Sequence, residues 1–194
     1  MAYTIGVIAD THIPDRVTEL HPRVLPIFRE AGVQHILHAG DICSSRPLQT
    51  LAELAPVSAV SGNRDLLLPQ LKSVEQLTLG GVRIALLHGH GTVAQYLWDK
   101  WQFWFWGYRL KRYLPLLDHA GASAQVIVFG HTHHPETTWH NGKLLFNPGS
   151  ASTGYLGLGN PSVGLLHIEE DGSIRAEVVK LEGFQIQQRQ WAAS

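Results

Sequence analysis

The chain has little cysteine, little charge and no long hydrophobic run, and each shortage excludes a class of protein. Cys43 is its one cysteine, which excludes an intramolecular disulfide framework and predicts a reducing compartment. Charged residues make up only 16% of the 194 residues, against an average of about 25%. The formal net charge of -1 gives no general reason to expect nucleic acid as a partner.

Signals for membranes and secretion are also missing. No apolar run approaches the roughly 20 residues that a transmembrane segment needs. Met1, Ala2 and Tyr3 lead directly into a predicted strand rather than into a signal peptide. We therefore expect a cytoplasmic protein. A length of 194 residues, 44% of them hydrophobic, fits one domain over residues 1–194 that can bury a substantial core.

Short apolar, β-branched runs recur along the chain. In the first half they alternate with helical patterns, whereas the second half is richer in hairpins. This pattern predicts an α/β (α+β) domain with a mixed sheet or two packed sheets. Ser44 or Ser45 is expected to cap the second helix. The expected strands are 3–9, 34–38, 57–60, 74–79, 82–87, 126–129, 137–139, 144–146, 163–168 and 174–180, and the expected helices are 22–31 and 47–54.

Histidine is abundant, with twelve residues, and two of them form the most informative stretch. His131 and His133 follow the buried-looking run 126–129 and Gly130, so they lie on the turn that leaves a strand. Neutral imidazole is the commonest metal ligand among side chains. Taken alone, this pair fits a metal site and a solvated loop equally well.

Other metal-ligand side chains follow four earlier strands. Open α/β sheets place their ligand crevice just beyond the carboxyl ends of their strands, so side chains distant in sequence could meet there. Each residue alone could be a helix cap, a turn residue or a core histidine, but the set together indicates function. The candidate metal ligands are Asp10, His12, Asp41, Asn63, His88, His131 and His133.

The donor types restrict the metal. Two carboxylates, four imidazoles and one amide, without thiolate, suit Mn²⁺, Fe²⁺, Zn²⁺, Co²⁺ or Ni²⁺. Seven ligands exceed what one ion with open positions needs, so we expect two ions. Two ions about 3.5–4 Å apart can clamp the attacking and leaving oxygens of an in-line displacement at phosphorus. Phosphoester hydrolysis is the predicted reaction class.

The ordered motifs D-x-H, G-D, G-N-x-D, H-G-H and G-H-T-H resemble those of the calcineurin-like metallophosphoesterases. The resemblance is strongest to the small bacterial and archaeal phosphodiesterases of the YfcE type. It runs from Tyr3 to about Ser150, and residues 147–150 match a further segment of that subgroup. It implies a two-sheet β-sandwich flanked by helices.

The resemblance also implies roles for the ligands and the ions. Asp10, His12 and His133 would hold one ion, and Asn63, His88 and His131 the other. Asp41 would bridge the two. The family reaction is in-line attack on a phosphodiester by a hydroxide between two divalent ions, often Mn²⁺.

Two further residues are candidate catalytic groups. Arg64 stands where many relatives carry histidine. It remains protonated, so it could neutralise charge on a phosphoryl oxygen, or it could form a salt bridge with Asp65 or another acidic neighbour. His90 could contact the phosphate, donate a proton, or simply support the ligands.

An aromatic stretch at residues 96–108 lies within a helical-looking insertion at residues 93–119. Eight of its thirteen residues are aromatic, too many for one helix to bury against its own domain. Self-association through this stretch is the first interpretation. A lid that binds an apolar or aromatic part of the substrate and a membrane contact are the alternatives.

Three functions therefore remain open. The first is a dinuclear metal phosphodiesterase acting on a small phosphoester. The second is a phosphomonoesterase or nucleotide-pyrophosphate hydrolase with the same ions. The third is a non-catalytic scaffold, because the resemblance extends to the small retromer subunit, a protein-interaction module of this fold.

Overall fold

The computed structural model describes residues 2–91, 98, 101, 105–154, 157 and 159–194. Two five-stranded sheets form its centre, with the strand orders β10-β9-β1-β2-β3 and β4-β5-β6-β8-β7. The strands of the first sheet are β1 (Tyr3–Ile8), β2 (His35–His38), β3 (Val57–Ala59), β9 (Ser162–Ile168) and β10 (Ile174–Lys180). Those of the second are β4 (Val74–Leu79), β5 (Val82–Leu87), β6 (Val126–Val128), β7 (Glu136–His140) and β8 (Lys143–Asn147).

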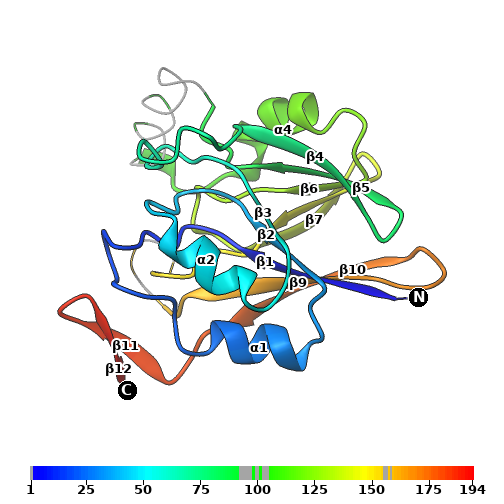
Figure 1. The fold of residues 1–194 in the computed structure, drawn as a ribbon. Coiled ribbons are helices and arrows are strands. Elements are labelled where there is room, and N and C mark those ends of the chain that lie inside the picture. The colour runs from blue at the N-terminus through cyan, green and yellow to red at the C-terminus, as the bar shows by residue number, and fades with distance from the viewer. Residues whose placement is uncertain (1, 92–97, 99–100, 102–104, 155–156, 158) are drawn as a thin grey trace.

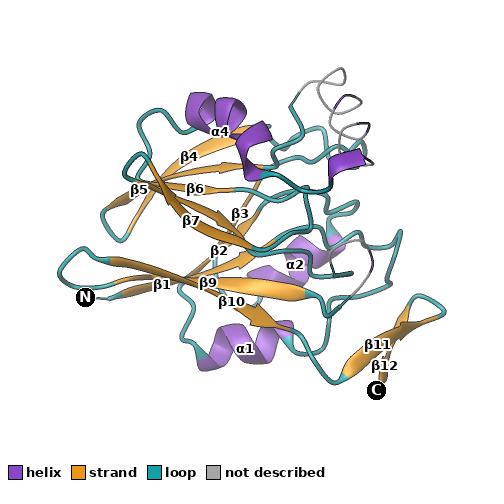
Figure 2. Ribbon diagram, turned by 180° about the vertical axis from the view of Figure 1, so that it is seen from behind, coloured by secondary structure: helices purple, strands orange, loops and turns teal. Residues whose placement is uncertain are grey.

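The two sheets pack face to face and carry helices on their outer faces (Figures 1 and 2). Side chains such as Val7 from β1 and Phe146 from β8 belong to one buried cluster between the sheets. On the first sheet, α1 (Val24–Glu30) and α2 (Arg46–Ala52) bury Phe28 and Leu51. On the second, η1 (Leu110–Arg112) and α4 (Leu114–Ala120) contribute to a third cluster around Leu117. The expected two-sheet sandwich flanked by helices is confirmed.

The sheets combine parallel and antiparallel strands, and the parallel ones position the site. β1, β2 and β3 are mutually parallel neighbours in the first sheet. In the second sheet β5, β6 and β8 are parallel. The carboxyl ends of each parallel set therefore lie at a single edge of each sheet.

Most expected elements differ from the structure by one or two residues at their ends. Ser45 holds the N-cap position of α2, as expected, but makes no side-chain cap hydrogen bond. The Ser44 hydroxyl donates to the Ile13 carbonyl instead. The last hairpin was missed. It consists of β11 (Phe184–Gln187) and β12 (Gln190–Ala193), whose glutamine-rich, mostly exposed sequence has no apolar run to reveal it.

This hairpin packs on the loop that follows β1. The Trp191 indole donates to the Glu19 carbonyl at 3.0 Å, and the Thr18 amide donates to the Arg189 carbonyl at 2.9 Å. The Trp191 ring also meets the buried His21 imidazole, with centroids 4.5 Å apart. The carboxyl-terminal hairpin thus anchors the loop that carries His12 and Arg16. Among the residues placed by the structure, no helix is both long and apolar enough to cross a membrane.

His21 should make the protein sensitive to acid. Burial, with the nearby charge of Arg23, lowers the pKa of His21 to about 4, so the unfolded chain binds its proton more readily. The stabilisation is present above about pH 6.5 and is lost as the pH falls towards 4. We expect wild type to lose on the order of 1–3 kcal/mol more unfolding free energy between pH 7 and pH 4 than His21→Asn does. Urea unfolding with chelator at both pH values measures this, and equal losses would contradict it.

Candidate metal centre

All seven candidate ligands lie just beyond the carboxyl ends of five strands, as the sequence predicted. Asp10 and His12 follow β1, and Asp41 and Asn63 follow β2 and β3. His88 follows β5, and the pair His131 and His133 follows β6. Since these strand ends belong to both sheets, the side chains converge between the two layers.

Five of the seven residues have a left-handed backbone conformation. Outside glycine such conformations are uncommon and persist only where the surrounding structure holds them; they cluster at functional sites. Hydrogen bonds from the 147–152 segment supply part of that support: Ser150 and Ser152 hydroxyls both donate to the Asp10 carbonyl, at 3.0 and 2.8 Å. The φ angles are 54° at Asp10, 50° at His12, 54° at Asp41, 70° at His131 and 54° at His133.

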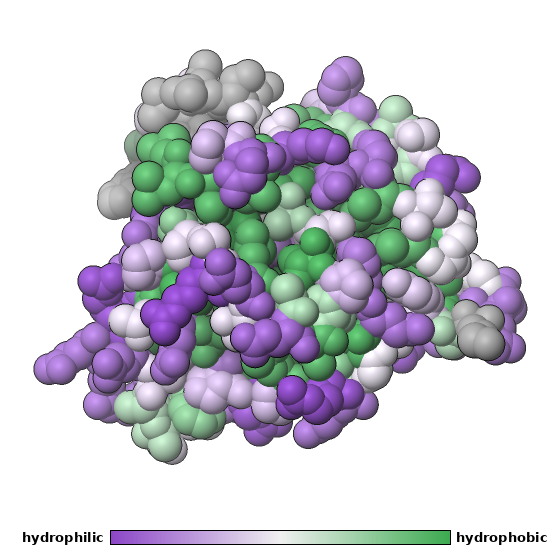
Figure 3. All heavy atoms as spheres, viewed as in Figure 1, coloured by the Kyte–Doolittle hydropathy of each residue, from purple (hydrophilic) through white to green (hydrophobic). Residues whose placement is uncertain are grey.

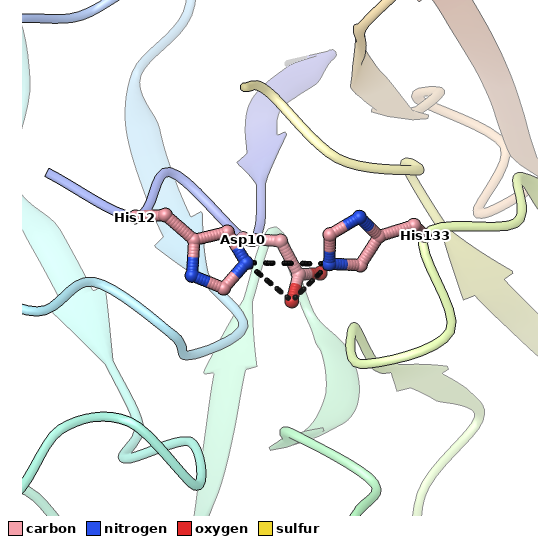
Figure 4. A group of neighbouring side chains, drawn as sticks. All are labelled: Asp10, His12 and His133. Carbon is pink, nitrogen blue, oxygen red and sulfur yellow. Dashed lines mark hydrogen bonds and ion pairs between the residues drawn. The ribbon is translucent and has the colours of Figure 1, made fainter. Parts of the chain in front are cut away.

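Asp10, His12 and His133 form the first cluster (Figure 4). The Nε2 atoms of His12 and His133 are 3.3 Å apart, and they lie 3.9 and 3.4 Å from Asp10 Oδ1. That oxygen is buried and has no hydrogen-bond partner in the described part of the chain. A buried carboxylate oxygen without a donor is costly, and a cation among these three atoms would offset that cost. The residues present therefore fit a metal ion.

His88 is the centre of the second cluster. Its Nδ1 donates to the Ala39 carbonyl at 2.7 Å, which leaves the Nε2 lone pair free to bind metal. Nε2 lies 3.4 Å from Asp41 Oδ1 and 3.2 Å from Asn63 Oδ1. The His131 ring packs edge-on against His88, with centroids 5.2 Å apart. Asp41 also reaches the first cluster, because its Oδ2 lies 3.9 Å from His12 Nε2.

The electrostatics of the cluster favour cations. Burial raises the pKa of Asp41 despite the nearby His88. Burial alone would also raise the pKa of Asp10, but the surrounding imidazoles, His133 first, bring it below its ordinary value. Burial lowers the pKa of His12 to about 3, so its imidazole is neutral near pH 7 and can act as a ligand.

Asp65 holds the second cluster in place, a role that its position in the sequence did not reveal. Its carboxylate is 4% exposed and accepts hydrogen bonds at 2.7 Å from the amides of Ile42, Cys43 and Gly62. Gly62 leaves no room for a side chain, since a Cβ there would lie 2.3 Å from Asp41 Oδ1. The aspartate two residues after Asn63 thereby ties the β2 loop to the β3 loop.

The two candidate catalytic residues lie at the edge of the cluster. The Arg64 side chain is 46% exposed and pairs with Asp15 at 3.6 Å, so it forms a salt bridge with an acidic neighbour other than Asp65. His90 lies beside the ligands, with its ring 5.4 Å from that of His88. Burial, then the nearby His88, lowers the pKa of His90 to about 4, so it is neutral near pH 7.

Arg16 is a further cation at the site that the sequence did not single out. Its Nη1 donates to Thr153 Oγ1 at 2.7 Å, and Thr153 Oγ1 lies 3.4 Å from His133 Nδ1. Burial, followed by the charge of Arg64, lowers the pKa of Arg16. The sequence feature that could have pointed to Arg16 is its position four residues after His12.

Comparison with known proteins agrees with this geometry. The family model described as the calcineurin-like phosphoesterase superfamily domain matches residues 3–171. The chain belongs to the calcineurin-like phosphoesterase superfamily. A relative from Methanothermobacter thermautotrophicus, named a probable metallophosphoesterase, is 35% identical over 180 residues, which cover 91% of each chain.

Two solved structures illustrate the range of this superfamily. Wild-type Vps29 from Entamoeba histolytica, complexed with zinc, has a TM-score of 0.65 and 29% identity, and the match covers 92% of this chain and 99% of that one. A structure described as a novel archaeal phosphodiesterase has a TM-score of 0.61 and 21% identity over 91% of this chain and 99% of its own. At that identity, the second likeness establishes the fold alone.

Proposed function

We propose that this protein is a metal-dependent phosphodiesterase that uses two divalent cations. The observation that carries the proposal is the buried cluster of carboxylates and imidazoles in which Asp10 Oδ1 has no donor among the described residues. Membership of the superfamily supports phosphoester hydrolysis as the reaction. The zinc complex of Vps29 supports metal binding by this fold.

In this proposal Asp10, His12 and His133 hold one cation, and Asn63, His88 and His131 hold the other. Asp41 lies between them, since its two oxygens face His88 and His12. When bound, the cations would activate water for attack and neutralise charge on phosphorus oxygens. Arg64 would neutralise a phosphoryl oxygen from the exposed side of the cluster, and neutral His90 would hydrogen-bond to the phosphate.

Metal removal tests the proposal directly. Protein stripped with chelator should lose hydrolysis of bis(p-nitrophenyl) phosphate, and Mn²⁺ should restore it most strongly in a series with Fe²⁺, Zn²⁺, Co²⁺ and Ni²⁺. Restored activity should reach a plateau near two ions per chain, measured by metal analysis. Turnover that persists unchanged after complete stripping would contradict the proposal.

Assays of the metal-loaded protein with other substrates distinguish a phosphodiesterase from the two alternative hydrolases. A phosphomonoesterase would prefer p-nitrophenyl phosphate, and a nucleotide-pyrophosphate hydrolase would cleave dinucleotide polyphosphates. We expect the diester to be hydrolysed with the highest kcat/KM of the three.

The Vps29 neighbours give specific support to a second candidate, a protein-interaction scaffold. Exposed hydrophobic side chains favour a contact surface, and hydrophobic residues reach the surface on the face shown in Figure 3. Self-association remains our proposal for residues 96–108, of which 96–97, 99–100 and 102–104 lie outside the described part of the chain. The exposed fractions are 60% at Trp98, 50% at Trp101, 62% at Phe105, 51% at Trp106, 87% at Leu66 and 81% at Leu67.

A further inference from the structure

A cavity of about 380 Å³ opens directly beside the candidate metal centre. His90 and His131 form the wall that it shares with the centre. Its other walls come from η1, the start of α4 and Trp98. This volume falls within the range of about 300–1,000 Å³ typical of small-molecule sites, and it exceeds the need of a phosphoryl group alone.

Two kinds of side chain line the cavity away from the metal centre. Trp98, Tyr113 and Leu116 supply flat and apolar surface. Lys111 and Arg112 supply positive charge, and none of the described residues that line the cavity is acidic. The lining therefore fits a ligand that combines an apolar ring with negative charge.

Trp98 and Arg112 are held in place by their neighbours. Trp98 stacks on Trp101, with centroids 5.1 Å apart and planes at 20°, and still remains 60% exposed. Arg112 Nη1 donates to the Gly107 carbonyl at 3.0 Å, which fixes the guanidinium at the end of η1. Stacking on an aromatic side chain stabilises a nucleobase, and arginine is well suited to phosphate.

We infer that this cavity is a leaving-group subsite for a nucleotide-type group, one that carries an aromatic base and a second phosphate. The inference rests on the proposed phosphodiesterase function. In hydrolysis, the oxygen of water bonds to phosphorus and the bond from phosphorus to the leaving oxygen breaks. That oxygen departs with a proton from the water, while the base and the second phosphate stay unchanged in the subsite. A hydrocarbon chain would leave both cations without an anionic partner, so a lipid tail fits this lining less well.

Binding of adenosine monophosphate tests the subsite without turnover. Isothermal titration of metal-loaded protein is done with saturating inorganic phosphate, which occupies the metal centre. We expect wild type to bind adenosine monophosphate at least about tenfold more tightly than adenosine. The double variant Lys111→Ala/Arg112→Ala should lose that preference, because each cation contributes charge-assisted hydrogen bonds. Trp98→Ala should lower the affinity for adenosine monophosphate and for adenosine by about tenfold each.

The matched control is Arg175→Ala/Lys180→Ala, which removes two exposed cations from β10 and should bind like wild type. Equal affinity for adenosine monophosphate in wild type and the Lys111/Arg112 double variant would overturn the inference. A wild type without preference for adenosine monophosphate would also overturn the inference if it bound anionic phospholipid vesicles. In that case Lys111→Ala/Arg112→Ala and Trp98→Ala would both lose the vesicle binding.

Hydrolysis of methyl p-nitrophenyl phosphate, which lacks a second phosphate, separates this inference from the proposed function. Turnover of this diester by metal-loaded wild type, together with nucleotide affinity that the double variant loses, supports both the phosphodiesterase and the subsite. No turnover in any metal-loaded protein, with nucleotide binding intact, would reject the phosphodiesterase and reduce the cavity to a nucleotide-binding site. Turnover without nucleotide affinity would reject the subsite alone.

Discussion

Asp41→Asn should lower kcat/KM for bis(p-nitrophenyl) phosphate by roughly 1,000-fold or more. The two oxygens of Asp41 face both histidine groups, at 3.4 Å from His88 Nε2 and 3.9 Å from His12 Nε2. An amide in its place removes a negative charge from between the two proposed cations, which should weaken metal binding and transition-state stabilisation together. Steady-state kinetics after chelation and Mn²⁺ addition measure the effect.

Stability measurements distinguish lost chemistry from lost folding in this variant. Because burial raises the pKa of Asp41, its charge is unfavourable in the metal-free protein. Metal-free Asp41→Asn should therefore unfold at the same or a higher urea concentration than wild type. Asp171→Asn, at an exposed turn between β9 and β10, is the matched control and should retain wild-type kinetics. Activity of Asp41→Asn within tenfold of wild type would contradict the two-cation assignment.

Asp65→Ala should produce the largest loss of stability. It removes the acceptor for the buried amides of Ile42 and Cys43 and for the part-buried amide of Gly62, each now bound at 2.7 Å. Hydrogen bonds to a charged group contribute about 1.5–3 kcal/mol each, and buried amides without an acceptor add a further cost. We expect the unfolding free energy to fall by about 3–5 kcal/mol, as measured by urea unfolding of the metal-free protein.

Asp65→Ala should also weaken metal binding, because the amides that Asp65 binds position Asp41 and Asn63. Metal analysis of Asp65→Ala should show weakened retention of the cation expected at Asn63 and His88, under conditions in which the variant is folded. Asp171→Ala makes the same chemical change at an exposed site and should cost less than about 0.5 kcal/mol. A fall below about 1 kcal/mol in Asp65→Ala would contradict the role assigned to this residue.

The strand ends were predictable because they depend on local patterns. The apolar runs 74–79, 82–87 and 174–180 coincide with β4, β5 and β10. Side-chain alternation and β-branched content make these runs recognisable as strands. The hairpin β11–β12 was not predictable in this way, since its stabilising contacts are with Glu19 and His21, more than 150 residues away.

The sequence by itself determined the fold class and the identity of the residues that gather at the site. Ligand-type side chains that follow parallel strands converge at one edge of a sheet. Motifs such as D-x-H and G-H-T-H already place such side chains directly after strands. It also determined the superfamily, because five motifs in order are more specific than any one of them.

Only the tertiary structure decided what surrounds those ligands. The Asp10 oxygen without a donor among the described residues, the three amides on Asp65 and the pairing of Arg64 with Asp15 each depend on loops distant in the chain. The cavity between His131 and Arg112 likewise exists only because η1 and α4 pack beside the β6 loop. Ligand identity is a local property of the sequence, whereas burial and the distance between charges are properties of the packed sheets.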